Sequence, residues 1–394
     1  MMAASLLSIE KHNITLVEKN EKLGKKLYIT GKGRCNFTNA CSNEDFIKNV
    51  ITNPKFLYSA IENFSAWDTI AFFEEKGMQT KQERGNRMFP ASDKSSDVIK
   101  ALSTYPKNVS IRLNTLVKDI RVQNDQVKSV ITDQGEIPCD VVVLATGGLS
   151  YPSTGSTGDG YRIAKRLGHT VTDTKPALVS LVSSDSCCKK LEGLSLKNVT
   201  ATIFLSGKKI KSEFGEMLFT AHGVSGPCIL TLSSYVCKKE LIDCELSIDL
   251  KPALSHEALE MRIMRDFSAL VNKSFKNSLD ALLPKSLIPI IIEKCGIDPD
   301  KKINQIKAEE RHSLVNLLKA FRIKIVELGP YTQAVITSGG ISVKEINPKT
   351  MESKIIKGLY VVGEVLDVDA LTGGFNLQIA FSTAATAAKA ILGG

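Results

Sequence analysis

The chain has 394 residues, of which 43% are hydrophobic and 24% charged; this composition is typical of a folded globular protein and excludes collagen-like, disordered and disulfide-scaffold classes. Its apolar runs are far shorter than the roughly 20 residues of a membrane span, so no membrane partner is expected. The net charge of +9 would suit a polyanion, but the lysines are spread along the chain without an arginine-rich arm, so no specific nucleic acid partner is expected.

The nine cysteines are an odd number and lack C-x-x-C spacing, so neither a metal site nor a redox pair of the thioredoxin type is predicted. Cys187 and Cys188 are neighbours, and a trans peptide holds their Cα atoms too close for an ordinary structural disulfide. Mostly buried thiols in a reducing compartment are therefore expected. Because no secretory signal precedes Glu10, the sequence predicts a cytoplasmic location.

The first third of the chain mixes predicted helices and strands. Apolar periodicity predicts helices over 3–11, 54–76 and 93–102, and strands over 13–19, 109–113, 116–123 and 127–132. Segment 24–39 is rich in Lys, Gly, Asn and Thr and has no hydrophobic period. We therefore expect it to be a loop that contacts a ligand.

An apolar strand of the kind found in parallel sheets follows over 139–148, and a helix is predicted over 161–167. The pattern then changes: residues 185–255 alternate like an antiparallel sheet, and residues 256–327 have helical periodicity. Strands at 334–337 and 358–364 and a helix at 379–392 restore the earlier pattern. The sequence thus predicts an α/β domain that is interrupted by an insertion and resumes near the C-terminus.

Three local patterns are typical of a dinucleotide site. Glu18 ends a strand, where an acid binds a nucleotide ribose, although strands also end in exposed acids. Gly373 and Gly374 open directly onto a helix whose free N–H groups and dipole would face an electron-rich flavin edge; the alternative is a plain turn. The turn at 145–148 packs small residues against a bound dinucleotide or is an ordinary βα turn.

Together these patterns are part of five long blocks: EKNEKLGKKLYITGKGRCNFTNAC, ATGGLSYPSTGSTGDGYRIAKRLGH, GEMLFTAHGVSGP, TSGGISVKEINPKTMESK and GEVLDVDALTGGFNLQIAFS. The blocks resemble a family of bacterial flavoproteins that includes bile-acid (3-dehydro-steroid) reductase-like and aminoacetone-oxidase-like proteins. The resemblance implies a glutathione-reductase-type, Rossmann-like FAD-binding domain over 1–182 and 333–394. A β-barrel-like plus helical insertion over 183–332 would cover the substrate side.

The resemblance also implies which residues hold FAD. Glu18 would bind the ribose with Lys19 beside it, Lys26 and Arg34 would offset phosphate charge, and Val117 would offer backbone bonds to adenine. It assigns no catalytic acid or base and no metal ligand. The remaining implied cofactor-binding residues are Thr30, Gly31, Gly33, Cys35, Asn36, Thr38, Ala145, Thr146, Gly147, Gly148, Gly363, Glu364, Asp367, Gly373, Gly374, Asn376, Leu377 and Gln378.

The chain departs from the family pattern in two places. Relatives tend to read Phe-Thr-His before x-Gly-x-Ser-Gly-Pro, whereas His222 stands one place later here, so a surface or core histidine is expected. Residues 1–4 match the helix after the third glycine of G-x-G-x-x-G, so about a dozen residues, the first strand and the phosphate turn, are expected to be missing. A misassigned start or a truncated product would explain this, and weak FAD binding from Met1 is then expected.

The implied function is that of an FAD-dependent oxidoreductase acting on a small organic substrate. NAD(P)H would be a transient electron donor, because no second G-x-G-x-x-G marks a separate nicotinamide domain. Three alternatives stay open: an oxidase that passes electrons to oxygen, a flavoprotein linked to tRNA, and an inactive FAD-binding remnant. The substrate, the redox partner and the oligomeric state are not fixed by the sequence.

Overall fold

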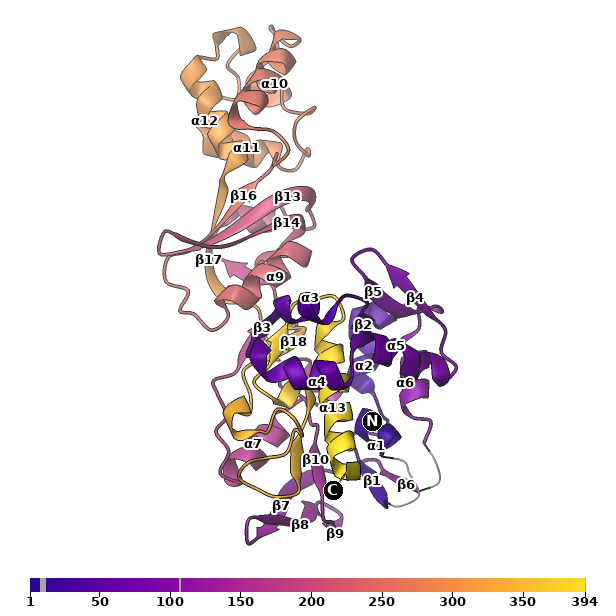
Figure 1. Ribbon diagram of the computed structural model, residues 1–394. Helices are drawn as coiled ribbons and strands as arrows, with labels where there is room; N and C mark the ends of the chain where they lie inside the picture. The colour runs from indigo at the N-terminus through magenta and orange to yellow at the C-terminus, as the bar shows by residue number, and fades with distance from the viewer. Residues whose placement is uncertain (8–11, 106–107, 394) are drawn as a thin grey trace. The chain divides into compact units, whose positions relative to one another are not determined.

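The computed structural model in Figure 1 describes residues 1–7, 12–105 and 108–393. It divides into two compact units, one formed by Met1–Ala177 with Pro330–Gly394 and the other by Leu178–Gly329. The boundaries predicted from the sequence lie a few residues further along the chain at both junctions. Part of the helix expected over 3–11 falls outside the described residues.

The first unit is built on parallel strands. Strand β1 (Ile14–Val17) pairs with β6 (Val109–Arg112), and β10 (Val142–Leu144) pairs with β19 (Leu359–Val361). Among the described residues these strands form two separate pairs. Their apolar, β-branched sequences suit strands that are covered by other elements, and parallel pairing of this kind is typical of α/β nucleotide-binding folds.

Small antiparallel sheets complete the strands of this unit: β2 (Thr38–Asn39) with β5 (Arg87–Pro90) and β4 (Thr80–Glu83); β7 (Val117–Gln123) with β8 (Gln126–Thr132) and β9 (Gly135–Pro138); β20 (Asp369–Ala370) with β3 (Val50–Thr52); and β11 (Lys175–Ala177) with β18 (Ile336–Ser338). Asn124 and Asp125 both have positive φ and form the tight turn between β7 and β8. This hairpin confirms the strands predicted on either side of that turn.

The helices of the first unit are α1 (Met2–Leu6), α2 (Lys25–Ile29), α3 (Asn43–Lys48), α4 (Tyr58–Asn63), α5 (Ala66–Glu75), α6 (Ser95–Leu102), α7 (Asp159–Arg166) and α13 (Phe375–Gly393). Helix α13 packs against α1 and α4, and Figure 1 shows it, in yellow, running through this unit. Phe73 joins α5 to α13 through edge-to-face contacts with Phe37 and Phe381 at 5.0 and 5.6 Å.

The second unit is a closed antiparallel barrel with helices. The barrel strands, in order around it, are β12 (Leu181–Ser183), β15 (Gly223–Ser225), β14 (Lys208–Thr220), β13 (Ser195–Leu205), β16 (Cys244–Asp249) and β17 (Phe321–Leu328). The helices are α8 (Cys187–Lys190), α9 (Pro227–Val236), α10 (His256–Ser268), α11 (Ile288–Cys295) and α12 (Ala308–Lys319). The last three gather beyond one end of the barrel (Figure 1), and one apolar core runs through barrel and helices.

The predicted fold class is confirmed: an α/β unit is interrupted by a barrel with helices. Three local predictions are wrong. Strand β17 lies in the segment expected to be helical, helix α9 in the segment expected to be a sheet, and helix α2 in the segment expected to be a loop. All nine cysteines are free thiols, and within the described residues no helix combines the length and the apolar character of a bilayer span.

Candidate functional site

Polar loops follow the carboxyl ends of three parallel strands in the first unit. Glu18 comes directly after β1, residues 145–148 follow β10, and Gly363 and Glu364 lie in the short 3-10 turn after β19. In α/β folds, ligands bind at this edge, because the strand ends leave room for loops that carry the contacts. Two of the three patterns singled out in the sequence, Glu18 and the turn 145–148, therefore share one kind of position in the fold, whereas Gly373 and Gly374 stand directly before α13 (Phe375–Gly393).

The carboxylate of Glu18 is held in place by Asn20. Its Oε1 accepts hydrogen bonds from the Asn20 backbone N–H at 2.8 Å and from Asn20 Nδ2 at 2.7 Å. Asn20 Nδ2 also donates to the carbonyl of Thr154 at 3.1 Å. This bridge needs a glycine at 155, because a Cβ there would lie 2.5 Å from Asn20 Nδ2. Asn20 is a positioning residue that sequence reasoning missed, because no local pattern marks it.

Lys19 and Val117 lie close to this carboxylate along the backbone. The ammonium of Lys19 binds Thr157 Oγ1 at 2.6 Å and the carboxylate of Asp159 at the start of α7. Val117 opens β7, two residues after Thr115, whose N–H donates to the Glu18 carbonyl at 3.0 Å. Both residues are thus placed beside Glu18, although the Lys19 charge is balanced by Asp159.

A second polar cluster joins α2 to the loops after β10 and β19. Lys26 Nζ lies 2.6 Å from Glu364 Oε2 and donates to Ser150 Oγ at 2.6 Å. Ser150 Oγ donates to Glu364 Oε1 at 2.8 Å, and the same oxygen accepts the Thr337 N–H at 3.0 Å. A Cβ at Gly148 would lie 2.5 Å from Thr337 Oγ1. These segments are therefore packed too closely for any other residue at 148.

The small residues after β10 fit against α7. A Cβ on Gly160, in the first turn of α7, would lie 2.0 Å from Thr146 Oγ1, and one on Gly147 would lie 3.2 Å from Ser156 Oγ. Gly147 also has a φ of 71°, a left-handed conformation that favours glycine. The turn 145–148 therefore lets strand and helix approach closely, which is also what an ordinary βα turn does.

The turn before α13 lies against the loop that carries Asn36 and Thr38. Gly374 has a φ of 97°, and a Cβ on it would lie 2.3 Å from the Thr38 carbonyl oxygen and 2.9 Å from Asn36 Oδ1. Thr38 Oγ1 donates to Gln378 Oε1 at 2.5 Å, which ties the two segments together. Only a glycine permits this contact between segments far apart in the sequence.

The side chains of Asn376 and Gln378 are occupied by the protein itself. Asn376 bonds the backbone of Ala370 at 2.9 and 2.8 Å, and Gln378 Nε2 donates to Ser382 Oγ at 2.9 Å. These two residues hold the turn, so any contact of this turn with a ligand comes from its backbone and from the free N–H groups of the first turn of α13. Leu377 is partly buried against the core, and the carbonyl of Asp367 accepts a bond from Asn53 Nδ2 at 2.7 Å.

Arg34 lies in a charge-balanced surface cluster. Its guanidinium pairs with Glu83 and with Asp93, and it stacks 4.3 Å from the centre of the Phe89 ring. The hydrogen bond from Arg34 lowers the pKa of Glu83, and Lys81 with Arg34 lowers the pKa of Asp93. The expected phosphate-binding role of Arg34 stays a prediction, because its partners in the structure are carboxylates.

The segment from Thr30 to Cys35 has unusual backbone geometry. Thr30 Oγ1 donates to the Lys26 carbonyl at 2.8 Å, and positive φ angles occur at Gly31, Lys32, Gly33 and Cys35. Non-glycine residues adopt such angles at a cost and are enriched in ligand-binding loops. Cys35 is fully buried, and burial raises the pKa of its thiol to about 12, so the group is a neutral thiol.

The groups present fit a flavin dinucleotide. Asn36 Oδ1 is a buried acceptor next to Gly374, and none of the residues that the structure describes donates a hydrogen bond to it; a flavin ring offers N–H groups that could satisfy it. Lys26 supplies a cation, and Glu18 supplies an oriented carboxylate for a ribose. His222, in contrast, is exposed in the turn between β14 and β15 of the second unit. Among the described residues no cluster of potential ligands for a metal ion occurs.

Known proteins are similar in sequence to this chain over nearly all of its residues. A family model described as the HI0933-like protein Rossmann domain matches residues 1–390. The 3-dehydro-bile acid delta(4,6)-reductase of Clostridium scindens is 30% identical over 384 residues, which cover 96% of this chain and 92% of that protein.

Two further relatives are named ribosomal RNA dihydrouridine synthase. The Escherichia coli protein is 30% identical over 395 residues, which cover 100% of this chain and 95% of that protein. The Haemophilus influenzae protein is 32% identical over 397 residues, with 99% and 94% covered. Among solved structures, the open conformation of a flavocytochrome c3 fumarate reductase matches with a TM-score of 0.49 and 17% identity, over 99% of this chain and 76% of that one.

The family match and the relatives agree with the site, in which a ribose-type carboxylate, a cation and a glycine cradle follow the parallel strands. FAD is therefore the cofactor of this chain, and the residues that hold it stay a prediction. The chain belongs to the HI0933-like Rossmann family and is an FAD-dependent oxidoreductase.

Proposed function

We propose that this protein reduces a carbon–carbon double bond conjugated to a carbonyl group in a small organic substrate, with NAD(P)H as the electron donor. The observation that carries the proposal is the pair of names among its relatives, a delta(4,6)-reductase of a 3-dehydro bile acid and dihydrouridine synthases. Reduction of an enone and reduction of a uracil ring both saturate a carbon–carbon double bond that is conjugated to a carbonyl group. Bound FAD supplies the two-electron chemistry for such a reaction.

The residues of the chain bind and orient the cofactor in this proposal. Glu18, held by Asn20, accepts hydrogen bonds from the adenosine ribose. The Lys26 ammonium, which lies 2.6 Å from Glu364 Oε2, would offset charge on the diphosphate, and the Glu364 carboxylate also accepts the Thr337 N–H and the hydroxyl of Ser150. Asn36 Oδ1 accepts from the ring, and the first turn of α13 presents its N–H groups and dipole to the electron-rich edge of the ring.

A single cofactor site supports alternating use by donor and substrate. The family model that matches the chain describes one Rossmann domain, and the sequence holds no G-x-G-x-x-G that would mark a separate nicotinamide domain. NAD(P)H would thus bind next to the flavin, deliver its electrons and leave before the unsaturated substrate enters. This order predicts ping-pong kinetics.

An anaerobic two-step titration tests the proposal. The FAD-loaded protein is first titrated with NADH and with NADPH, and we expect one of them to bleach the flavin absorbance. A 3-oxo steroid with a conjugated double bond is then added, and we expect the yellow colour to return with loss of the substrate's double bond. Recovery of colour only after oxygen is admitted would instead establish an oxidase, and a chain that stays colourless with added FAD would establish a remnant.

A second substrate class is uridine within RNA. Two of the relatives carry a name that places the reduced uridine in ribosomal RNA. In the anaerobic titration, a transcript rich in uridine replaces the steroid, and nucleoside analysis of the product for dihydrouridine distinguishes this class from the first.

A further inference from the structure

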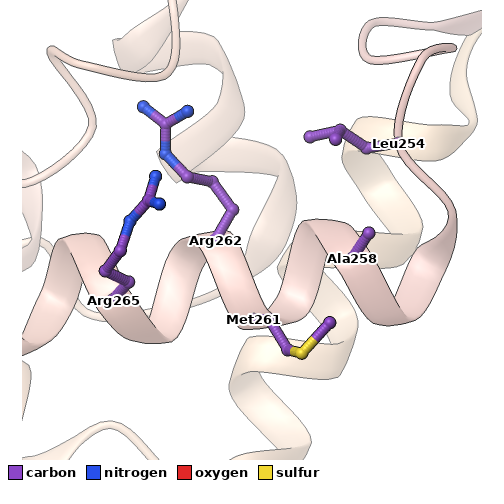
Figure 2. A pocket seen from close by; sticks show the side chains of 5 residues that line it. All are labelled: Leu254, Ala258, Met261, Arg262 and Arg265. Carbon is purple, nitrogen blue, oxygen red and sulfur yellow. The ribbon is translucent and has the colours of Figure 1, made fainter.

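An open pocket lies on the first helix of the helical part of the second unit. Helix α10 begins after Ser255, whose side chain accepts the Ala258 N–H at 3.1 Å. Its buried face is formed by Leu259, Ile263 and Phe267. The pocket lies on another face of the helix, with a volume of about 350 Å³, and its lining residues are Leu254, Ala258, Met261, Arg262 and Arg265. Figure 2 shows the side chains of Arg262 and Arg265 rising from the same side of α10.

Positive charge at this place exceeds negative charge. Asp266 is the carboxylate next to both arginines, at 2.7 Å from Arg262 Nε and 3.7 Å from Arg265 Nε. Lys251 adds a third cation, and burial together with the nearby Arg262 lowers the pKa of its ammonium group. Within the described part of the chain, no carboxylate forms an ion pair with the Lys251 ammonium.

Asp249, the carboxylate two residues before Lys251, is already engaged. Lys319 Nζ lies 2.6 Å from Asp249 Oδ2 and donates to the carbonyls of Lys251 and Leu254 at 3.2 and 2.7 Å. The other oxygen of Asp249 accepts the backbone N–H of Lys251 at 2.9 Å. Arg262 and Arg265 therefore share one carboxylate at the pocket, and Lys251, whose carbonyl accepts the N–H of the pocket residue Leu254 at 3.0 Å, adds a further cation nearby. Like charges that are partly removed from water are unfavourable, so such a cluster is a place where an anion gains binding energy.

We infer that Lys251, Arg262 and Arg265 form a docking site for the phosphates of a single-stranded RNA. Guanidinium groups bind phosphate oxygens in pairs, and a nearby ammonium adds a point charge. Met261, which also lines the pocket, is 65% exposed, and Met264 on the same helix is 50% exposed; flexible methionine side chains adapt to a bound ligand. Phosphate contacts next to apolar side chains on an open surface suit a strand that passes over the helix, because its bases and riboses can lie on the methionines.

This inference deepens the RNA substrate class and rests on it for its role in the reaction. The surface would hold the strand by its backbone, independent of base sequence, while the flavin unit carries out the chemistry. Sequence reasoning missed it because the lysines and arginines are spread along the chain, and the pocket on α10 is visible only in the fold.

Binding of a fluorescently labelled, uridine-rich single-stranded RNA to the full-length, FAD-loaded protein tests the site in the absence of NAD(P)H. The variants are Lys251→Gln, Arg265→Gln and their combination. Arg322→Gln is the control. Arg322 is an exposed barrel arginine paired with Glu245 at 2.9 Å, and this substitution removes the same unit of charge as each single variant. Kd is measured by fluorescence anisotropy over a series of salt concentrations.

We expect the double variant to bind RNA about tenfold more weakly and each single variant to lower the slope of log Kd against log salt by about 0.7. The control should retain the parent Kd. Because removal of Lys251 relieves repulsion with Arg262, Lys251→Gln should also melt at a slightly higher temperature, whereas loss of a purely structural lysine would lower the melting temperature.

Equal weakening by Arg322→Gln and by the double variant would overturn the inference, since the effect would then come from net charge alone. Competition by inorganic phosphate as effective as competition by unlabelled RNA would also overturn it, in favour of a small-anion site. Binding is measured without the reaction, so failure here leaves the flavin titration intact. Conversely, a flavin that no unsaturated substrate reoxidises contradicts the proposed function without changing these Kd values.

Discussion

At the scale of single residues, the carboxylate of Glu18 is fixed by two hydrogen bonds from Asn20 before any ligand arrives. A group that is already oriented loses little conformational entropy on binding, so its hydrogen bonds with a ribose add directly to affinity. We expect Glu18→Ala to weaken FAD binding by about 1.5–3 kcal/mol, or about one to two orders of magnitude in Kd, while the fold persists.

Titration of the apoprotein with FAD, followed by quenching of flavin fluorescence, measures this change. Glu21→Ala is the matched control, because Glu21 is an exposed acid three positions away that pairs with Lys25 at 3.2 Å. An unchanged FAD affinity in Glu18→Ala would remove this carboxylate from the cofactor site.

The buried acceptor Asn36 Oδ1 leads to opposite predictions for the stability of the apoprotein and for the stabilisation by FAD. A buried polar atom without a partner costs about 1–3 kcal/mol, so Asn36→Leu should raise the melting temperature of the apoprotein. The same variant should show a smaller rise in melting temperature on addition of FAD, because the acceptor for the ring is gone. Asn39→Leu is the control, since Asn39 donates to the carbonyls of Gly85 and Gly373 and its loss should destabilise both states. A lower apoprotein melting temperature in Asn36→Leu would contradict the assignment.

Sequence reasoning identified the residues of this site that carry local signals and missed those that act through tertiary contacts. Glu18, Gly373 and Gly374 stand at a strand end and a helix start, which are visible in a short stretch of sequence. Ser150 and Thr337 carry no such signal, and they join the site only because the chain brings Lys26 and Glu364 together across 338 positions. Side-chain networks of this kind follow from the fold and not from spacing.

At the scale of elements, the close approach of the loop around Thr38 to the start of α13 depends on Gly374. Gly374→Ala should destabilise the protein in two ways: the positive φ costs about 1–2 kcal/mol, and the contact of a Cβ with the Thr38 carbonyl costs about 1–3 kcal/mol more. Gly77→Ala separates the two contributions, because Gly77 has a φ of 82° and open space around it. Urea unfolding of both variants checks this, and equal losses would mean that the contact relaxes without cost.

The wrongly predicted elements have physical explanations of the same kind. In β17, Phe321, Ile323 and Ile325 are buried, which is the period of a strand, but the segment follows three helices without a strong breaker. In α9, Cys228, Ile229 and Leu232 have helical spacing that was outweighed by the alternation on both sides. Helix α2 has no buried residue, so it lacks the apolar stripe by which an amphipathic helix is recognised.

At the scale of the whole molecule, the residues that the structure describes form two hydrophobic cores that share no residue. The first belongs to the Rossmann-like unit, to which we assign FAD, and the second to the barrel and its helices. We therefore expect two unfolding transitions in scanning calorimetry. At FAD concentrations about a hundred times Kd, ligand binding adds about 2.7 kcal/mol to the first unit and should raise its transition by about 5–10 °C.

The temperature of the second unit's unfolding transition should not change when FAD is added. Excess free riboflavin, which lacks the adenosine and the diphosphate, is the control for unspecific stabilisation and should shift neither transition. A single transition that moves as a whole with FAD would mean that the two cores unfold as one cooperative unit.

The buried thiol of Cys35 allows opening of the segment from Thr30 to Cys35 to be measured by a chemical reaction. A neutral, fully covered thiol does not react with iodoacetamide, so alkylation at Cys35 proceeds only during the fraction of time in which the loop opens. The rate of Cys35 alkylation, followed by mass spectrometry of the peptide that contains it, therefore measures how often the segment from Thr30 to Cys35 opens. If bound FAD keeps this segment closed, the alkylation rate falls in proportion to cofactor occupancy. One native cysteine then reports cofactor exchange without any attached probe.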